Sequence, residues 1–235
     1  EEQGDLAGAL ERFHAALDVE SALLQKQPDD NTLRRNVAAS NNAVGAVLRA
    51  SGDLADALSH HRAELALQQE LVRREPGTAA WRQYLSVSHN RVAMLLEAMG
   101  QVDEAAGHAA EAVVITARLG AEDPSNVDWQ RELGISHYRA GTIADARGAR
   151  GEAQRHLSSA LAIMGRVAGR DPLNPARQRD LADVHAAIAQ HHLAAGDAPR
   201  AVAEARAAQA VAERLLAKSA DDRQARRLLG LALSL

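Results

Sequence analysis

Three histidines that recur at a fixed interval are the first candidates for chemistry in this chain, because imidazole is both a metal ligand and an acid–base group. His89, His137 and His185 are separated by steps of 48 residues. Equivalent positions in stacked repeats lie on the order of 10 Å apart, which is the spacing of packed helices. A metal ion holds its nitrogen ligands at about 2 Å and cannot bridge that gap. We therefore expect these histidines to be polar groups tied to their own helix pair, and we predict no metal site.

The sequence lacks the other patterns that are typical of catalysis. Two adjacent pairs, His60–His61 and His191–His192, would point their side chains apart on a helix, and no His-Glu-x-x-His motif occurs. There is no Gly-x-Ser-x-Gly elbow and no glycine-rich phosphate loop. The absence of cysteine excludes disulfides, thiolate metal sites and a cysteine nucleophile. We predict that this chain is not an enzyme and binds no cofactor.

The bulk composition narrows the classes of partner. Of the 235 residues, 46% are apolar and 25% are charged, and the net charge is −4. This mild charge and an aromatic content of 2% argue against a nucleic-acid partner. No apolar run reaches the roughly 18 residues of a membrane span. Together with the missing cysteine, which fits a reducing compartment, these features predict a cytoplasmic protein with neither a nucleic-acid nor a membrane partner.

A period of 48 residues organises the chain from end to end. Its glycine marks are Gly4, Gly52, Gly100, Gly148 and Gly196. Halfway between them stand Pro28, Pro76, Pro124 and Pro172. Self-similarity at a fixed period is typical of a solenoid, in which each repeat packs on its neighbours. We predict a single solenoid over residues 1–235, and we interpret the chain as a piece of a larger protein because it opens in mid-repeat without a starting Met.

The segments between the marks have the pattern of helices. In residues 53–75 the apolar residues recur mostly at steps of three, four and seven. The fifth position of the proline series holds Ala220. A short polar residue that can cap a helix start follows each of the five positions by two: Asp30, Thr78, Asn126, Asn174 and Asp222. Each glycine mark can adopt the left-handed conformation that ends a helix. We predict an all-α chain of about ten helices, in which helix A of each repeat runs from proline to glycine and helix B from glycine to proline.

Small residues recur at fixed distances from the glycine marks. Five residues after each mark stand Ala9, Ala57, Ala105, Ala153 and Ala201. Seven residues before the later marks stand Gly45, Ala93, Gly141 and Ala189. Together with the glycine turn, this series resembles the signature of the tetratricopeptide repeat (TPR). The resemblance implies a right-handed superhelical solenoid of antiparallel helix pairs whose role is to bind other proteins.

The repeat departs from the common TPR in its length. The common unit has 34 residues, so the repeat of this chain is 14 residues longer. Each of its two helices gains seven residues, which is about two turns. Because two turns bring a helix back to the same face, the added turns extend the buried columns. The columns in helix B are Val19, Leu67, Ile115, Ile163 and Val211, and Leu23, Leu71, Leu119, Val167 and Leu215. The column in helix A is Val37, Leu85, Leu133, Leu181 and Leu229. The chain looks like the long-repeat arrays of bacterial multidomain signalling proteins, which carry kinase, ATPase or peptidase modules elsewhere.

The resemblance also implies which residues face a ligand, because helix A lines the concave groove of TPR arrays. Ten, nine or six residues before a glycine mark, these positions hold Asn42, Asn90, Arg91, Tyr138, Arg139 and Gln190. Two turns before the asparagine column, four of five positions hold arginine, and these could form a basic stripe suited to carboxylates: Arg35, Arg131, Arg179 and Arg227. An alternative stays open, in which these arginines pair across repeats with acidic neighbours such as Glu132 and Asp180.

Two functions follow from this reading. We expect a non-catalytic scaffold or sensing array that binds a peptide or protein segment in its groove, including an acidic one. The alternative is a self-assembly module, because the end faces of a repeat array can stack on further copies of the chain.

Overall fold

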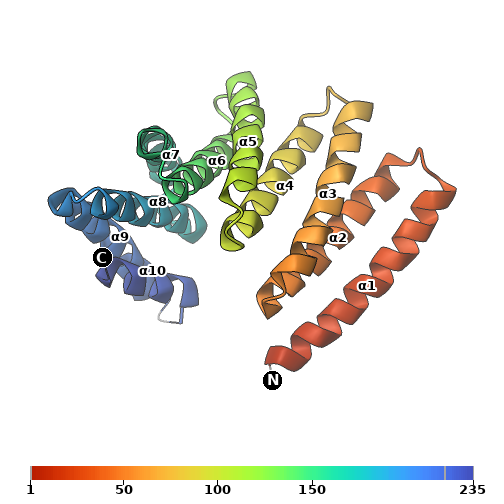
Figure 1. Cartoon of the computed structure of the whole chain (residues 1–235), viewed down its shortest axis with the longest axis horizontal. Coiled ribbons are helices and arrows are strands. Elements are labelled where there is room, and N and C mark those ends of the chain that lie inside the picture. The colour runs from red at the N-terminus through yellow and green to blue at the C-terminus, as the bar shows by residue number, and fades with distance from the viewer. Residues whose placement is uncertain (1, 220, 235) are drawn as a thin grey trace. The chain divides into compact units, whose positions relative to one another are not determined.

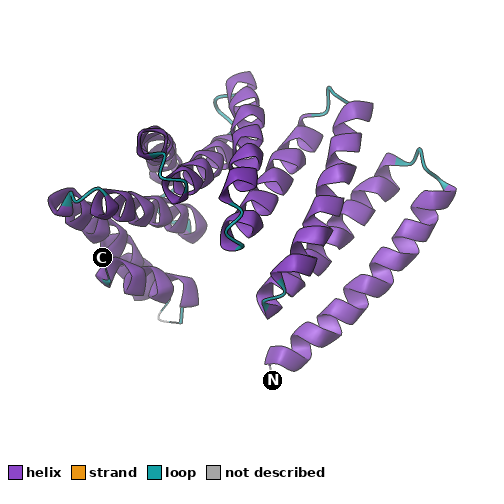
Figure 2. Ribbon diagram, in the orientation of Figure 1, coloured by secondary structure: helices purple, strands orange, loops and turns teal. Residues whose placement is uncertain are grey.

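A computed structural model describes the backbone of residues 2–219 and 221–234, and the side chains from Leu6 onward in the same ranges. All the regular structure in these ranges is helical (Figures 1 and 2). The helices are α1 (Glu2–Lys26), α2 (Asn31–Ser51), α3 (Leu54–Arg74), α4 (Ala79–Ala98), α5 (Val102–Glu122), α6 (Val127–Ala146), α7 (Arg150–Arg170), α8 (Pro175–Ala194), α9 (Ala198–Lys218) and α10 (Arg223–Leu233). The prediction of an all-α chain with about ten helices is confirmed. None of these helices combines the length and apolar character that crossing a bilayer requires.

Most of the predicted helix caps are formed. The side chains of Asp30, Asn126, Asn174 and Asp222 each accept two backbone N–H groups at the start of a helix A. Thr78 has the same extended backbone before α4 but makes no capping bond with its side chain. The four marks from Gly52 to Gly196 have φ between 75° and 91°. Glycine adopts this left-handed conformation without strain, which explains why it recurs at each A-to-B turn.

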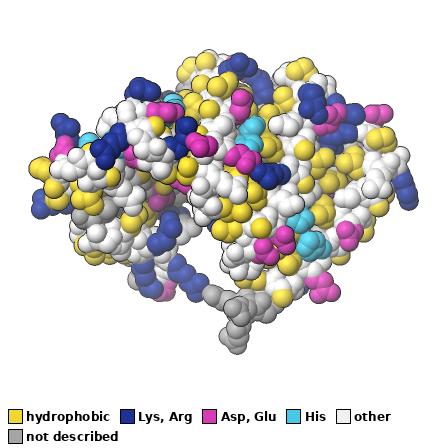
Figure 3. All heavy atoms as spheres, in the orientation of Figure 1, with side chains coloured by type: hydrophobic (Ala, Val, Ile, Leu, Met, Phe, Trp, Pro, Cys, Tyr) yellow, Lys and Arg dark blue, Asp and Glu magenta, His cyan; other side chains and the backbone are white. Residues whose placement is uncertain are grey.

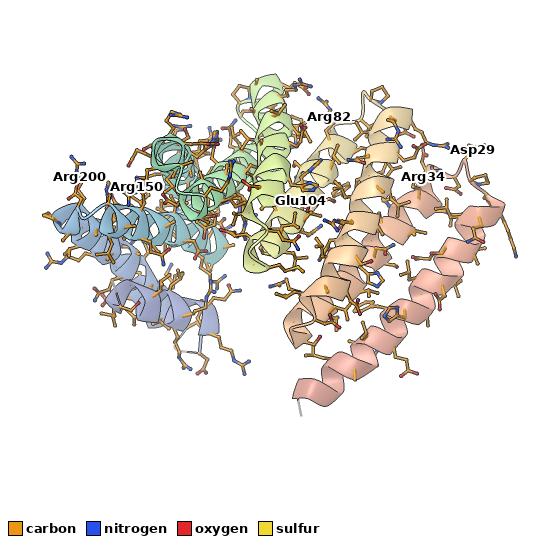
Figure 4. All side chains as sticks on the ribbon, in the orientation of Figure 1. Asp29, Arg34, Arg82, Glu104, Arg150 and Arg200 are labelled. Carbon is orange, nitrogen blue, oxygen red and sulfur yellow. The ribbon has the colours of Figure 1, made fainter. Side chains whose placement is uncertain are left out.

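The short connection between α1 and α2 is held by an arginine. Arg34 is buried in α2; its Nη2 donates to the carbonyl oxygen of Pro28, and its Nη1 donates to Asn31 Oδ1 at 2.7 Å (Figure 4). On the same connection, Asp29 forms a 3.0 Å ion pair with Arg74 at the end of α3. These contacts tie the proline turn of one repeat to the helices that follow it.

The helices group into two compact units, residues 1–115 and 116–235, and each unit is described by itself. In the first unit α1, α2, α3 and α4 pack in sequential order, and in the second α6 to α10 do the same. In the second unit α6 also contacts α8, and α8 contacts α10, whereas α7 and α9 make no such contact in the part that the structure describes. The A helices of the second unit, α6, α8 and α10, therefore line its inner side, and the B helices α7 and α9 lie on its outer side.

Two residues set the distance between helix A and helix B within each repeat. A Cβ atom added to Gly45 would lie 2.8 Å from His61 Nε2, and one added to Gly141 would lie 2.7 Å from Leu157 Cγ. In these two repeats, glycine occupies the position in helix A, and a large residue occupies the contacting position in helix B, 16 residues later. In the other two repeats both members of the pair are alanine: Ala93 with Ala109, and Ala189 with Ala205. The repeats keep close helix packing by exchanging volume between the two positions.

Outside the first helix, the members of the predicted core columns are buried or half-buried, the half-buried ones being Leu67, Ile115, Leu133, Leu181 and Leu229. Val19 is 62% exposed and Leu23 is 40% exposed, whereas the equivalent Leu71, Leu119 and Leu215 are buried. Among the described helices of the first unit, α1 packs only against α2. A helix with a neighbour on one side leaves its other apolar side in solvent, and this corrects the assignment of Val19 and Leu23 to the core.

Candidate functional site

Three of the predicted binding residues meet in one pocket of the first unit. Arg35 and Asn42 on α2 and Arg91 on α4 line a pocket of about 350 Å³. The other lining residues are Asn36, Ala39, Glu64, Gln68 and Tyr84. We call this the α2–α4 pocket. Asn90, the neighbour of Arg91, is buried and lies outside the lining.

A buried carboxylate forms one wall of the α2–α4 pocket. Glu64 on α3 is 3% exposed and stands where the other repeats have alanine. Arg91 Nη1 donates to Glu64 Oε1 at 2.6 Å, and Ser88 Oγ lies 3.0 Å from the same oxygen. His61 Nδ1 lies 3.0 Å from Glu64 Oε2. A buried charge requires such partners, so Arg91 is held in place by Glu64 while part of its side chain still faces the pocket.

The outer part of the pocket combines a cation, an amide and an aromatic ring. Arg35 is exposed, and its Nη2 donates to Asn36 Oδ1 at 3.2 Å. Asn42 is half-buried two turns further along the same face of α2. Tyr84 on α4 is 48% exposed, with its ring centroid 6.1 Å from that of Trp81. The outer part thus offers hydrogen-bond donors beside an accessible aromatic surface.

Tyr138 and Arg139 lie together in a smaller pocket of the second unit, with a volume of about 160 Å³. The guanidinium carbon of Arg139 lies 5.5 Å from the Tyr138 ring centroid, in the range of a cation–π contact. Asp180 and Asp183 line the same pocket. Burial raises the pKa of the Asp183 carboxyl above its usual value, although the positive charges of Arg227 and Arg139 oppose this rise.

Two more arginines of the predicted stripe, Arg131 and Arg179, are bound to acidic residues in the next repeat. Arg131 Nε lies 2.5 Å from Asp180 Oδ2, and Arg179 Nη2 lies 2.7 Å from Asp222 Oδ2. The pairing across repeats that the sequence left open therefore occurs at both positions. Their part in binding stays a prediction. Gln190 is exposed on α8 and lines neither pocket.

The recurring histidines bind a side chain on the following helix, 19 residues later. His89 Nδ1 lies 3.0 Å from His108 Nδ1, and His137 Nδ1 lies 2.9 Å from His156 Nδ1. His185 Nδ1 is 2.6 Å from Glu204 Oε2. The expectation that these histidines are tied to their own helix pair is confirmed. In the ranges that the structure covers, no three His, Asp or Glu side chains are arranged to hold a metal ion.

The histidine–histidine pairs are held in the neutral form. Burial lowers the pKa of His89 and of His137 to about 4, and the partner histidine adds to the shift. A hydrogen bond between two Nδ1 atoms needs one ring to donate and the other to accept, which two neutral imidazoles can do. The 19-residue spacing from His89 to His108 and from His137 to His156 is visible in the sequence and could have identified both pairs.

The sequence analysis missed Glu64, Gln68 and Tyr84 as parts of the site. Glu64 gave a signal, because it is a charged residue in a column of alanines. Figure 3 adds that basic and acidic side chains are interspersed on the visible face, which agrees with the many local ion pairs.

The chain was compared with known proteins. No protein-family model and no curated protein matches the sequence. Among solved structures, BtubC (BKLC) from P. vanneervenii aligns over 97% of this chain and 90% of its own, with a TM-score of 0.64 and 16% identity. A putative kinesin light chain of Podosopora anserina with nearly identical TPR-like repeats aligns over 91% of both chains, with a TM-score of 0.55 and 22% identity. Likeness at this level of identity concerns the fold, and the helix pairs that pack in sequence agree with it: the chain has the fold of TPR-like repeat proteins.

Proposed function

We propose that this chain is a non-catalytic scaffold that binds an extended peptide or protein segment along the A helices. TPR-like folds generally serve protein interaction, and the A-helix residues of this chain support that role. The observation that carries the proposal is the α2–α4 pocket, where Arg35, Asn42 and Arg91 meet on one side of the first unit. Hydrogen-bonding side chains around a pocket of this size can fix one side chain of a bound segment.

The arginine pairing bears on the kind of segment. An acidic segment would have to displace Asp180 from Arg131 and Asp222 from Arg179, and both contacts are short. Arg35, in contrast, donates a hydrogen bond to the neutral side-chain amide of Asn36. We therefore propose a polar segment whose acidic residues, where present, lie near Arg35. The resemblance to long-repeat arrays suggests a cytoplasmic bacterial signalling protein as the setting.

The test is selection of peptides from a random library on the immobilised chain. We expect enriched peptides to bind Asn42→Asp and Arg139→Ala at least about tenfold more weakly, the size of one or two lost hydrogen bonds. The control is Arg200→Glu on helix B, because Arg200 is exposed and its ion pair is a local one with Asp197, three residues earlier. Failure to enrich any peptide, or equal binding by all variants, would contradict the proposal.

A second candidate function is self-association through α1. Phe13, Val19 and Leu23 are exposed large apolar residues on this helix, and covering them on another copy would remove apolar surface from water. Light scattering after size exclusion, over a range of concentrations, should then show a mass that rises with concentration. Val19→Glu should abolish this rise, while Val202→Glu, at another exposed valine, should not. A constant monomer mass at all concentrations would eliminate this candidate.

A further inference from the structure

We propose that the α2–α4 pocket recognises a primary carboxamide, namely the side chain of an asparagine or glutamine in the bound segment. This inference rests on the proposed function, because the pocket lies among the A-helix residues of the groove. It adds the chemical group that the pocket selects.

Gln68 lines the pocket from α3, one turn after Glu64. Its side chain is buried, and its Oε1 has no hydrogen-bond partner among the residues that the structure describes. A buried polar group without a partner costs about 1–3 kcal/mol. Such groups are rare in folded proteins, and one that lines a pocket indicates a partner supplied from outside.

The preceding repeat shows how a polar side chain at this position can be satisfied. Glu20 stands 48 residues before Gln68, and its Oε2 accepts a hydrogen bond from Ser40 Oγ at 2.6 Å. Ser88 is the equivalent serine for Gln68. Its hydroxyl lies instead 3.0 Å from Glu64 Oε1 and 3.0 Å from the carbonyl oxygen of Tyr84. The Ser88 hydroxyl is therefore bound to Glu64 and Tyr84 instead of Gln68, and Gln68 lines the pocket without this donor.

The charges next to Gln68 disfavour an ionic side chain at that place, whereas the exposed Arg35 at the outer part of the pocket remains open to an acidic residue. A carboxylate inserted here would bring a third acceptor beside Gln68 Oε1 and the buried Glu64 carboxylate. An ammonium group would lie among the guanidinium groups of Arg35 and Arg91, which line the same pocket. Like charges and unmatched acceptors in a partly buried site are costly. The pocket therefore favours a neutral group.

A primary carboxamide matches the pocket because it donates and accepts on one planar group. Its NH₂ can donate to Gln68 Oε1 while its oxygen accepts from Asn42 or Arg91. Two carboxamides also pair reciprocally, N–H to O in both directions, so the match holds whichever way the Gln68 amide is turned. The pocket volume of about 350 Å³ is at the small end of ligand sites, which suits one side chain. Ala39 and Tyr84 supply apolar walls for its methylene groups.

The experiment is an NMR titration of the ¹⁵N-labelled full chain with three probes: the N-acetyl, N-methylamide derivatives of glutamine, glutamate and methionine. These probes share the same backbone amides and differ only in the side chain. We expect the glutamine probe to shift the Gln68 side-chain amide signal and to saturate at about tenfold lower concentration than the other two. Equal affinity for all three probes would overturn the inference.

Variants separate the pocket from non-specific binding. Gln68→Met keeps the length of the side chain but removes the amide, and should remove the preference for glutamine. The matched control is Gln69→Met, because Gln69 is the exposed neighbour on the same helix and its replacement should retain the preference. Helical circular dichroism checks that both variants fold. Retention of the preference by a folded Gln68→Met variant would refute the assignment.

The library selection distinguishes this inference from the proposed function. Two results together would support both the proposed function and the carboxamide pocket. The enriched peptides would carry asparagine or glutamine at one fixed place, and they would no longer bind the Gln68→Met variant. Peptides that bind the groove without a fixed amide residue would leave the proposed function standing and refute the carboxamide pocket. If no peptide is enriched the proposed function fails, and the probe titration still decides for or against the pocket.

Discussion

Replacing Gly141 by alanine should destabilise the chain, although alanine is the better helix former. Gly141 lies inside α6, where Gly→Ala alone would stabilise by about 1 kcal/mol. The added Cβ, however, would lie 2.7 Å from Leu157 Cγ and 3.2 Å from the backbone nitrogen of Leu157. Leu157 is buried and its backbone cannot rotate away. Overpacking costs up to about 3 kcal/mol, so we expect a net loss of about 2 kcal/mol.

The matched control is Gly165→Ala. Gly165 lies inside α7, and a Cβ added there meets nothing within 4 Å. This variant should gain up to about 1 kcal/mol, since only the helix propensity changes. Urea unfolding, followed by circular dichroism, should therefore move the midpoint in opposite directions for the two variants.

A second change should compensate the first. Gly141→Ala combined with Leu157→Ala recreates the alanine pair that occurs at Ala93 and Ala109. Leu157→Ala alone should cost about 2–5 kcal/mol, and the double variant should be more stable than the sum of the two single effects by about 1–3 kcal/mol. If Gly141→Ala stabilises as much as Gly165→Ala does, or if the two effects simply add, the explanation by exchanged volume is wrong.

Two further predictions concern the histidine pairs and the helix caps. The pKa of His89 and of His137 is about 4 in the folded chain and about 6.5 when unfolded, so the unfolded state binds more protons below pH 6.5. The free energy of unfolding should be constant above that pH and fall between pH 6.5 and 4, by about 1–2 kcal/mol per histidine at pH 5 once partial exposure is allowed for. Equal urea midpoints at pH 7.5 and pH 5 would contradict this. Asp30→Ala should cost about 1 kcal/mol, whereas Thr78→Ala should cost much less because Thr78 makes no side-chain capping bond; thermal unfolding compares the two, and equal losses would reject the reasoning.

The sequence was sufficient for the helices because the signals for their ends are local. A capping side chain such as Asn126 acts on backbone groups two and three residues away, and a left-handed glycine such as Gly148 acts on its own turn. Because these local signals recur at a fixed period, each repeat supports the prediction of an all-α chain independently. The same logic failed for Val19, because burial depends on whether another helix lies against that face.

The candidate site was only partly predictable, since its members depend on contacts between helices. Arg35, Asn42 and Arg91 are predicted by their positions along helix A, and they line one pocket; that they bind a partner stays a prediction. Position along helix A did not show that Arg131 would bind Asp180, or that Ser88 would turn to Glu64 and leave Gln68 without a donor. Those outcomes depend on competition among several nearby partners at distances of about 3 Å.

The sequence by itself determined the period, the helices, most of their caps and the apolar face of each helix, because backbone conformation and amphipathic spacing are set by neighbours along the chain. The tertiary structure alone decided which arginines are already paired, which histidines share a proton, and which buried amide lacks a partner. The physical reason is that a hydrogen bond is made or lost over a few tenths of an ångström, and that distance is fixed only when the helices of successive repeats have packed.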